Sequence, residues 1–167
     1  MKIKILLLVS AIFLFSCRKE DEGDIQKIDQ ILNFYIKDSS GKDLLNTKIK
    51  GGYTTITAQD LNGVKALQAI SGISVKKDKD TVAYIDYSAG AVRILKDSVS
   101  ATQKTYQSDY YLNLIKVVNK ETIIDVDTVK IEYNWSPSLF QVSKVWYNNK
   151  LAFSKTEGQA NIVNIVK

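Results

Sequence analysis

Along most of the chain, apolar and polar side chains alternate with the period of two that is typical of a β-strand with one buried face. Leu32, Phe34 and Ile36 form the first such series. The pattern is longest over residues 110–118 and 123–135, which therefore predict two long strands. Shorter strands are expected at 53–58, 73–75, 81–87, 92–95, 140–147, 151–153 and 162–166, with 42–49 as a weak strand or loop.

Turn-forming residues separate these segments and favour hairpin connections. Residues 38–41 (Asp-Ser-Ser-Gly) are a turn signal, and 119–121 (Asn-Lys-Glu) join the two long strands. Residues 148–149 are both Asn, a residue type that tolerates the positive φ of tight hairpin turns. Ser136-Pro137 should end the strand before it, because proline has no N–H group to donate to a ladder.

Two stretches do not follow the strand pattern clearly. Residues 57–70 can be read as a helix with a capping start, yet Asn62-Gly63 inside them is a strong hairpin signal. We therefore favour a turn followed by a strand in this stretch. Residues 96–107 lack apolar periodicity and predict a mobile loop.

The sequence predicts an all-β protein, because it contains nine or ten short strand patterns separated by hairpin turns and no convincing long helix. The expected architecture is an antiparallel β-sandwich, immunoglobulin-like or transthyretin-like, with a small β-barrel as the alternative. We expect residues 30–167 to form this single domain, since a chain of that length can bury a substantial core.

The first 16 residues have a different pattern, which is typical of a signal peptide. Lys2 and Lys4 precede an apolar run, 5–15, that is interrupted only by Ser10. About 20 apolar residues are needed to cross a bilayer, so this run is too short for a comfortable transmembrane helix. A charged start followed by a short apolar segment indicates secretion.

The end of this segment, Leu14-Phe15-Ser16-Cys17, resembles the lipobox of bacterial lipoproteins. The resemblance implies cleavage before Cys17, the only cysteine of the chain, and its conversion into a thioether-linked diacylglyceryl and N-acyl anchor. The membrane is thus an expected partner through the lipid anchor, because several acyl chains together hold a protein durably. Residues 17–29 would comprise the lipidated cysteine and a charged, flexible tether.

Lys19, Glu20 and Asp21 directly follow the cysteine and resemble the export tag of surface lipoproteins in the Bacteroidota. This resemblance implies an outer-membrane protein whose domain faces the medium. The alternatives are an inner-facing position on the outer membrane, attachment to the inner membrane, or an ordinary charged linker.

The residue types that the chain lacks limit the catalytic reactions and metal sites that the expected domain can have. The chain contains no His, and lipidation of Cys17 would leave no thiol, so imidazole catalysis and soft metal sites are excluded. No cofactor is expected. Loss of Lys2 and Lys4 with the signal peptide would reduce the net charge from +5 to 5 − 2 = +3. A charge this small, spread along the chain, argues against nucleic acid as a partner.

Acidic residues offer the remaining candidate for catalysis or metal binding. Asp125 and Asp127 lie two apart on one strand and hence on one face, with Asp109 in a neighbouring strand. Such carboxylates can bind Ca²⁺ or act as acid and base in glycoside cleavage. We favour a solvent-facing polar stretch, because the spacing lacks the density and glycine of calcium loops.

Aromatic residues are concentrated in the second half of the chain. Exposed aromatic rings on a sheet can stack on sugars or form protein contacts, although aromatics are also common in strand cores. Trp146 and Tyr147 are adjacent and must point to opposite faces of their strand. The candidate binding residues are Tyr110, Tyr111, Trp146 and Tyr147.

Three Asp-Ser/Thr-aliphatic tripeptides resemble the O-glycosylation acceptors of Bacteroidota envelope proteins. The acceptor residues would be Thr81, Ser98 and Thr128, and Ser98 lies in the expected loop. The sequence as a whole favours a non-catalytic surface lipoprotein that binds another envelope protein or a glycan. The alternatives are a periplasm-facing accessory subunit and a hydrolase that uses only carboxylates.

Overall fold

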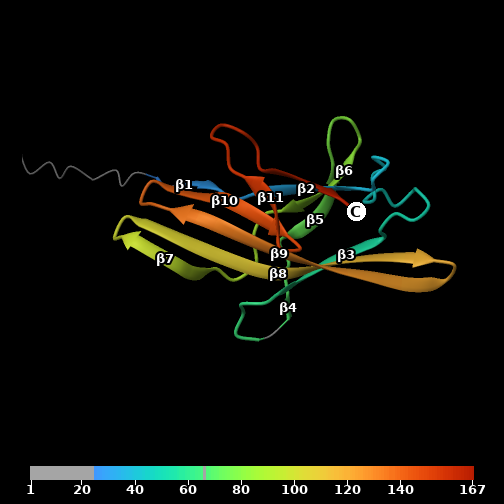
Figure 1. The fold of residues 1–167 in the computed structure, drawn as a ribbon, viewed down its shortest axis with the longest axis horizontal. Helices are drawn as coiled ribbons and strands as arrows, with labels where there is room; N and C mark the ends of the chain where they lie inside the picture. Colours follow the sequence, from blue (N-terminus) through green and yellow to red (C-terminus); the bar gives the residue numbers. More distant parts are fainter. Residues whose placement is uncertain (1–24, 66) are drawn as a thin grey trace, which may run out of the picture.

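The computed structural model describes residues 25–65 and 67–167, and the chain folds as two β-sheets packed face to face (Figure 1). The expected all-β sandwich is thus confirmed. The proposed signal peptide, Cys17 and the segment Lys19, Glu20 and Asp21 lie outside the described residues. The described ranges include no helix with the length and apolar character needed to cross a membrane.

The larger sheet is built around the two longest strands. In spatial order it contains β1 (Lys27–Asp29), β10 (Leu139–Tyr147), β9 (Glu121–Trp135), β8 (Gln103–Val118), β3 (Thr55–Asp60) and β4 (Gln68–Ala69). Two further strands share its edges, because β11 (Lys150–Ser154) also pairs with β10, and β7 (Ile94–Ser100) also pairs with β8.

The smaller sheet has the spatial order β12 (Ile162–Val166), β2 (Leu32–Lys37), β6 (Ala83–Tyr87) and β5 (Ile73–Lys77). Its two sides approach the larger sheet where β11 contacts β12 and β3 contacts β5. Most strand pairs are antiparallel as expected, but β1 pairs with β10 and β12 pairs with β2 in parallel. The sandwich is therefore mainly antiparallel, with these two parallel pairs as the departures.

The core lies between the facing sheets and follows the alternation of the sequence. Phe34 and Ile85 are paired on β2 and β6, and both are almost fully buried. From the larger sheet, Leu112 and Ile131 point into the same core. Tyr87 stacks on Tyr110 across the two sheets, with ring centroids 5.2 Å apart. Offset stacking of this kind adds to the stabilisation that buried area provides.

Residues 57–70 contain no helix among the residues that are described there. Thr57 to Asp60 belong to β3, and the chain then turns and returns as the short strand β4, which pairs antiparallel with β3. The preferred prediction of a turn followed by a strand is confirmed. Asp60 supports the turn, since its carboxylate accepts a hydrogen bond of 2.7 Å from the Asn62 amide.

The predicted loop over residues 96–107 is wrong, because most of it forms the β7–β8 hairpin. Every residue of β7 is exposed, so the strand has no apolar face to create an alternating pattern. Its pairing with β8 also shifts register after Leu95 and after Ser98, which breaks the period further. Backbone pairing thus produced a strand that side-chain periodicity did not indicate.

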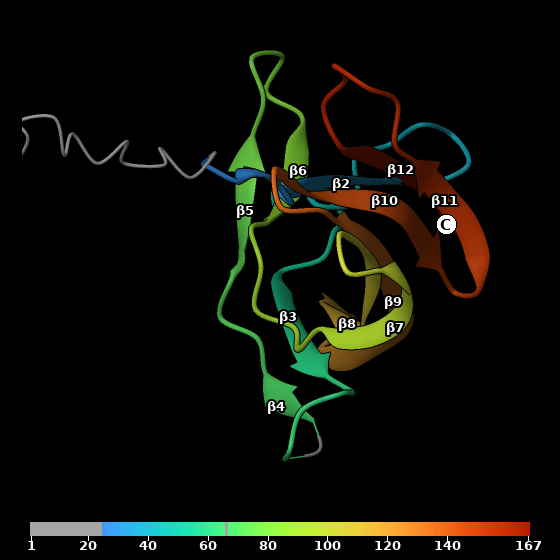
Figure 2. The same cartoon turned by 90° about the vertical axis from the view of Figure 1, so that its left-hand side faces the viewer.

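The molecule is elongated along β8 and β9 (Figure 1). The described chain begins with β1 at one end of this long axis, the end that also has the β7–β8 turn. The tip of the β8–β9 hairpin extends past the rest of the fold at the opposite end. Figure 2 shows the curvature of the larger sheet from the end where β1 begins.

Candidate functional site

At the end of the molecule where β1 begins, the core-facing side of the larger sheet becomes partly exposed to solvent. Along β9, Val129 and Ile131 are completely covered, whereas Trp135 on the same face is only half-buried. Trp135 is in register with Phe140 on β10, which is in register with Ile28 on β1. Ile28 is 62% exposed and Phe140 is buried, so this row forms an apolar floor that is exposed at Ile28 and partly exposed at Trp135.

A guanidinium group lies over this floor. Arg93 directly precedes β7, and its Cζ atom is 5.1 Å from the centroid of the Tyr133 ring and 4.8 Å from that of Phe140. Its Nη2 atom donates a hydrogen bond of 2.5 Å to the side chain of Gln30. Burial raises the pKa of Tyr133, and the nearby Arg93 charge opposes that rise.

A second cation lies over the next ring of the floor. Lys104 on β8 is paired in register with Trp135, and its Nζ atom is 4.9 Å from the ring centroid. Cation–π contacts of this kind are worth about 0.5–1 kcal/mol at exposed positions. The lysine stem is flexible, so the ammonium group can pivot from the ring towards a ligand.

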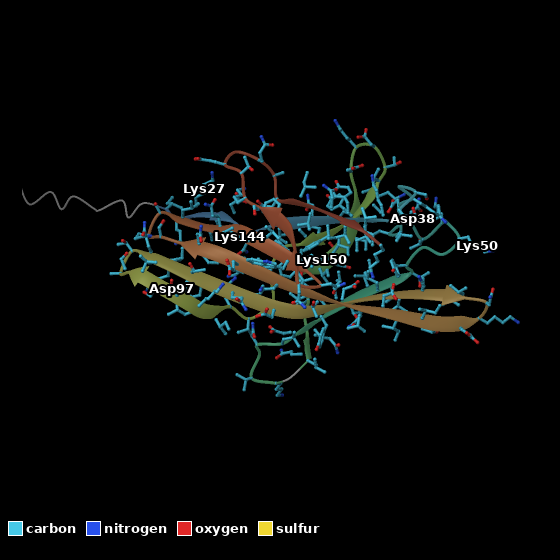
Figure 3. The ribbon with its side chains drawn as sticks, in the orientation of Figure 1. Lys27, Asp38, Lys50, Asp97, Lys144 and Lys150 are labelled. Atoms are coloured by element: carbon cyan, nitrogen blue, oxygen red, sulfur yellow. The ribbon has the colours of Figure 1, made fainter. Side chains whose placement is uncertain are left out.

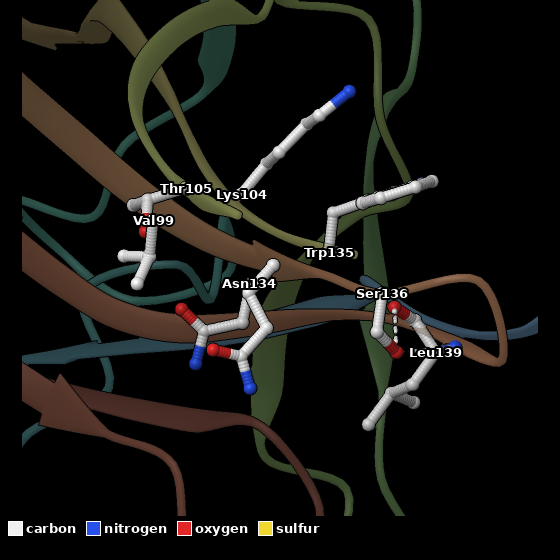
Figure 4. Close-up of a pocket in the computed structure, with 8 residues that line it drawn as sticks. Val99, Lys104, Thr105, Asn134, Trp135, Ser136 and Leu139 are labelled. Atoms are coloured by element: carbon white, nitrogen blue, oxygen red, sulfur yellow. Dashed lines mark hydrogen bonds between the residues drawn. The ribbon is translucent and has the colours of Figure 1, made fainter. Parts of the chain in front are cut away.

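Lys104 and Trp135 border a cavity of about 290 Å³ (Figure 4). Figure 4 shows these two side chains on one side of the cavity, with Val99 and Thr105 on the other. This volume is near the lower limit of about 300 Å³ for ligand pockets. The cavity also has polar groups on its wall, contributed by Gln103, Asn134 and Ser136.

We call Arg93, Lys104, Tyr133, Trp135 and Phe140 the aromatic–cation site. Within residues 25–65 and 67–167, neither cation of this site forms an ion pair with a carboxylate. Tyr133 and Phe140 are buried beneath Arg93, so the half-buried indole of Trp135 is the ring that the site offers to a ligand. Beside it lie two positive charges and neighbouring amide and hydroxyl groups. This chemistry suits a ligand that has both a flat apolar face and an anionic group.

The four aromatic residues predicted to bind a partner do not form one surface. Tyr110 and Tyr147 are only 1% and 6% exposed and belong to the core. Tyr111 and Trp146 are half-buried on the opposite, outer face of the larger sheet. The expectation that Trp146 and Tyr147 point to opposite faces is confirmed, and burial removes Tyr110 and Tyr147 from any exposed patch.

The carboxylates of Asp125 and Asp127 come together with the C-terminal lysine. Lys167 Nζ lies 3.4 Å from Asp125 Oδ2 and 2.6 Å from Asp127 Oδ2. Tyr53 donates a hydrogen bond to Asp125, and Tyr147 donates one to Asp127. Both carboxylates line a cavity of about 440 Å³ on the core side of β9, where the side chain of Asp127 is 7% exposed and that of Asp125 is 36% exposed. The expected solvent-facing stretch is therefore wrong for Asp127.

The pKa of Asp125 is shifted in a clear direction. The hydrogen bond from Tyr53, helped by the Lys167 charge, lowers the pKa of Asp125 below its ordinary value of 3.8. A general acid for glycoside cleavage needs a raised pKa, so that it carries a proton near neutral pH. Asp125 is shifted in the opposite direction, which favours a structural role for the pair.

Asp109 does not join the acidic pair. It lies on the outer face of β8, where it accepts hydrogen bonds of 2.7 Å from Gln107 and 3.1 Å from Asn62. Among the described residues, no group of three or more acidic or other metal-ligating side chains is arranged to hold a metal ion.

The three candidate glycosylation sites occupy different environments. Thr81 is exposed in the β5–β6 turn, with a positive φ of 65°. Ser98 is exposed on β7, which is a strand and not the predicted loop. Thr128 is half-buried on β9, and its backbone amide donates a hydrogen bond of 2.8 Å to the Asn148 side chain.

Sequence reasoning missed the aromatic–cation site because its residues come from four separate segments. The alternation of β9 continues through Tyr133 to Trp135, and a continuous alternating pattern is typical of core positions for both rings. Ser136-Pro137 ends the strand directly afterwards, and this boundary was the available signal that Trp135 stands at an edge. Nothing in the sequence placed Arg93 over these rings.

The chain was also compared with known proteins. Neither a family model, nor a curated protein, nor a solved structure matches it.

Proposed function

We propose that this protein is a non-catalytic lipoprotein of the bacterial outer membrane, displayed on the cell surface, that binds an acidic sugar at the aromatic–cation site. The observation that carries the binding proposal is the placement of Lys104 over Trp135 beside a polar-walled cavity. A sugar ring can lie against the indole face while its carboxylate pairs with the lysine.

The anchoring part of the proposal rests on the sequence of the first 21 residues. Cys17 follows a short apolar segment in a lipobox-like motif, and Lys19, Glu20 and Asp21 follow it as an export-tag-like run. The test is metabolic labelling with a radioactive fatty acid, with Cys17→Ser as the control that loses the label. Cleavage of the domain by protease added to intact cells would support surface display, and protection until lysis would contradict it.

The non-catalytic part is supported by the state of the acidic pair. Lys167 bridges Asp125 and Asp127, and each carboxylate also accepts a tyrosine hydroxyl. A carboxylate with a lowered pKa is ionised at neutral pH and cannot protonate a leaving group.

Sugar binding is tested by titration calorimetry of the mature protein with a disaccharide that contains glucuronic acid and with its neutral glucose counterpart. Trp135→Ala should weaken binding of both sugars by roughly two- to tenfold, since stacking contributes about 0.5–1.5 kcal/mol. Lys104→Met should weaken the binding of the acidic sugar but not that of the neutral sugar, because it removes the positive charge and keeps the apolar stem of the side chain.

Trp146→Ala is the matched control, because Trp146 is a half-buried tryptophan on the outer face of the same sheet. It should leave both affinities unchanged. Equal binding by Trp135→Ala and the unmodified protein, or no binding of the acidic sugar at all, would contradict the proposal.

A second candidate function is favoured by the hairpin tip at the far end of the molecule. Val117, Ile124 and Val126 are 56%, 55% and 56% exposed on one face of the β8–β9 hairpin. An exposed apolar group of this kind suits an accessory subunit that contacts another envelope protein. A photo-crosslinking residue at position 124 should then capture a specific protein in cells, whereas one at position 144 should not.

A further inference from the structure

The first described residues of the chain form part of the wall beside the aromatic–cation site. The Gln26 side chain donates a hydrogen bond of 2.6 Å to the carbonyl oxygen of Ser136, which lines the cavity. The Lys27 amide donates one of 2.9 Å to the carbonyl oxygen of Ser138. The position at which the chain enters the domain is therefore fixed next to the site.

The distance from this position to the proposed anchor has a strict upper limit. Eight residues lead from Cys17 to Ile25, and a fully extended chain of that length reaches about 29 Å at most. The β8 strand alone has 16 residues, which at about 3.3 Å each span about 53 Å. If Cys17 is lipidated, the site lies close to the membrane and the β8–β9 hairpin tip can lie far from it.

The surface around the entry position is both apolar and positively charged. Ile25, Ile28 and Ile31 are 95%, 62% and 55% exposed, and they are spaced along the segment that enters and leaves β1. Figure 3 shows Lys27 on β1 and Asp97 on β7 at this end, and the acidic Asp29 of β1 is paired with Lys155. Arg93 and Lys104 add the two cations of the aromatic–cation site.

We propose that the aromatic–cation site faces the membrane that carries the lipid anchor and binds the acidic sugar headgroup of a glycolipid in that membrane. This inference rests on the proposed function, because it needs both the anchor at Cys17 and the affinity for acidic sugars. It adds the source of the sugar and the orientation of the domain on the bilayer.

Tethering makes such a site effective even when its intrinsic affinity is weak. A short flexible linker presents a site at an effective concentration in the millimolar range. Glycolipid headgroups are also concentrated in the plane of the bilayer, within reach of the eight-residue connection. A single ring contact and a charge pair, which give weak binding in solution, are then sufficient for occupancy.

The two tryptophans of the chain allow a direct test of this orientation. Trp135 belongs to the site, whereas Trp146 lies eleven positions further along the chain on the outer face. Trp146→Phe leaves Trp135 as the sole reporter, and Trp135→Phe leaves Trp146 while keeping an aromatic ring in the site. The mature lipoprotein of each variant is reconstituted into phosphatidylcholine vesicles that contain a lipid with a nitroxide on its headgroup.

Each variant is measured with and without a glycolipid whose headgroup is glucuronic acid. We expect the glycolipid to cause loss of most of the Trp135 fluorescence and to leave Trp146 fluorescence nearly unchanged. Lys104→Met in the Trp146→Phe background should abolish the effect of the glycolipid. A neutral glycolipid with a glucose headgroup should not replace the acidic one.

Each possible failure has a distinct signature. Quenching of Trp146 but not Trp135 would overturn the proposed orientation, and quenching of neither would show that the site does not meet the headgroups. If soluble glucuronic acid disaccharide still binds in either case, the proposed function survives and only this inference fails. If the soluble sugar does not bind, the proposed function fails with it.

Discussion

The hydroxyl group of Tyr147 donates a hydrogen bond of 2.5 Å to Oδ2 of Asp127, and both residues are buried. Asp127 is one of the few acidic side chains inside the fold, and Asn148 and Lys167 supply its other partners at 2.7 Å and 2.6 Å. A buried carboxylate is tolerated only when its oxygen atoms are paired in this way. The cluster thereby closes one end of the core.

Removal of the Tyr147 hydroxyl should therefore destabilise the protein. Tyr147→Phe keeps the ring but leaves Asp127 Oδ2 with one partner fewer, which costs about 1–3 kcal/mol in the free energy of unfolding. Tyr111→Phe is the matched control on the outer face and should change that free energy by less than about 0.5 kcal/mol. Urea denaturation followed by tryptophan fluorescence measures both, and equal values would contradict the role of this hydrogen bond.

The acidic residues with lowered pKa values predict how stability depends on pH. A hydrogen bond from Tyr53, together with Lys167, lowers the pKa of Asp125 below 3.8. Burial would raise the pKa of Asp29, but its hydrogen bonds with Lys155 and Asn161 lower it overall.

A lowered pKa in the folded state means that the unfolded chain binds protons more readily. The stabilisation is therefore complete above about pH 5, where the unfolded-state carboxyl is also ionised, and is lost as the pH falls through the folded-state pKa. Urea midpoints should be constant from about pH 6 to about pH 5 and decrease below it. Asp125→Asn should make this decrease shallower, and an unchanged slope would argue against a shifted carboxyl at this position.

The sequence was sufficient to predict most of the strands, because side chains with one buried face repeat with a period of two. Residues 162–166 illustrate this success, since the expected strand matches β12 from end to end. The β7 strand illustrates the limit, because an exposed edge strand is held by backbone hydrogen bonds that any sequence can form. The parallel pair of β1 and β10 joins segments more than 100 residues apart, and local patterning contains no information about it.

The candidate site could be predicted less well than the fold. Lipid anchoring was proposed from a local motif, but the aromatic–cation site depends on contacts between distant segments. Whether an aromatic ring lies in the core or at the surface depends on how far the second sheet extends over it. Tyr110 and Trp135 both lie on the core-facing side of adjacent strands, yet only Tyr110 is covered.

The turn between β8 and β9 offers a stabilising substitution. Asn119 and Lys120 both have positive φ values, 53° and 70°, which match the preferred geometry of a two-residue hairpin turn. Lysine is disfavoured in this region by about 1–2 kcal/mol, whereas glycine adopts it without strain.

Lys120→Gly should therefore raise the free energy of unfolding by about 0.5–1 kcal/mol after the greater entropy of the unfolded chain is included. The control is Glu121→Gly, which places glycine in the first position of β9 and should lower stability. Thermal melting distinguishes the two variants by the direction of the change in Tm. A decrease for Lys120→Gly would mean that the left-handed turn is not maintained in solution.

The close approach of Gly72 to Ala89 fixes the segment that leads to Arg93. A Cβ atom at position 72 would lie 1.9 Å from the carbonyl oxygen of Ala89, and the Gly72 carbonyl already accepts a hydrogen bond of 3.0 Å from Ser88. Because the obstructing atom belongs to the backbone, the two segments must move apart to accommodate alanine. This movement would displace the chain just before the residue whose guanidinium lies over Tyr133 and Phe140.

Gly72→Ala should thus lower the free energy of unfolding by about 1–3 kcal/mol, as expected for overpacking. It should also weaken acidic-sugar binding, even though Gly72 itself does not contact the aromatic–cation site. Gly63→Ala is the control, because its added Cβ would be 3.3 Å from the nearest atom, the carbonyl oxygen of Lys65, in a half-buried turn where a small shift relieves the contact. If Gly72→Ala were as stable as Gly63→Ala but bound the sugar less tightly, steric strain would not be the link between this turn and the site.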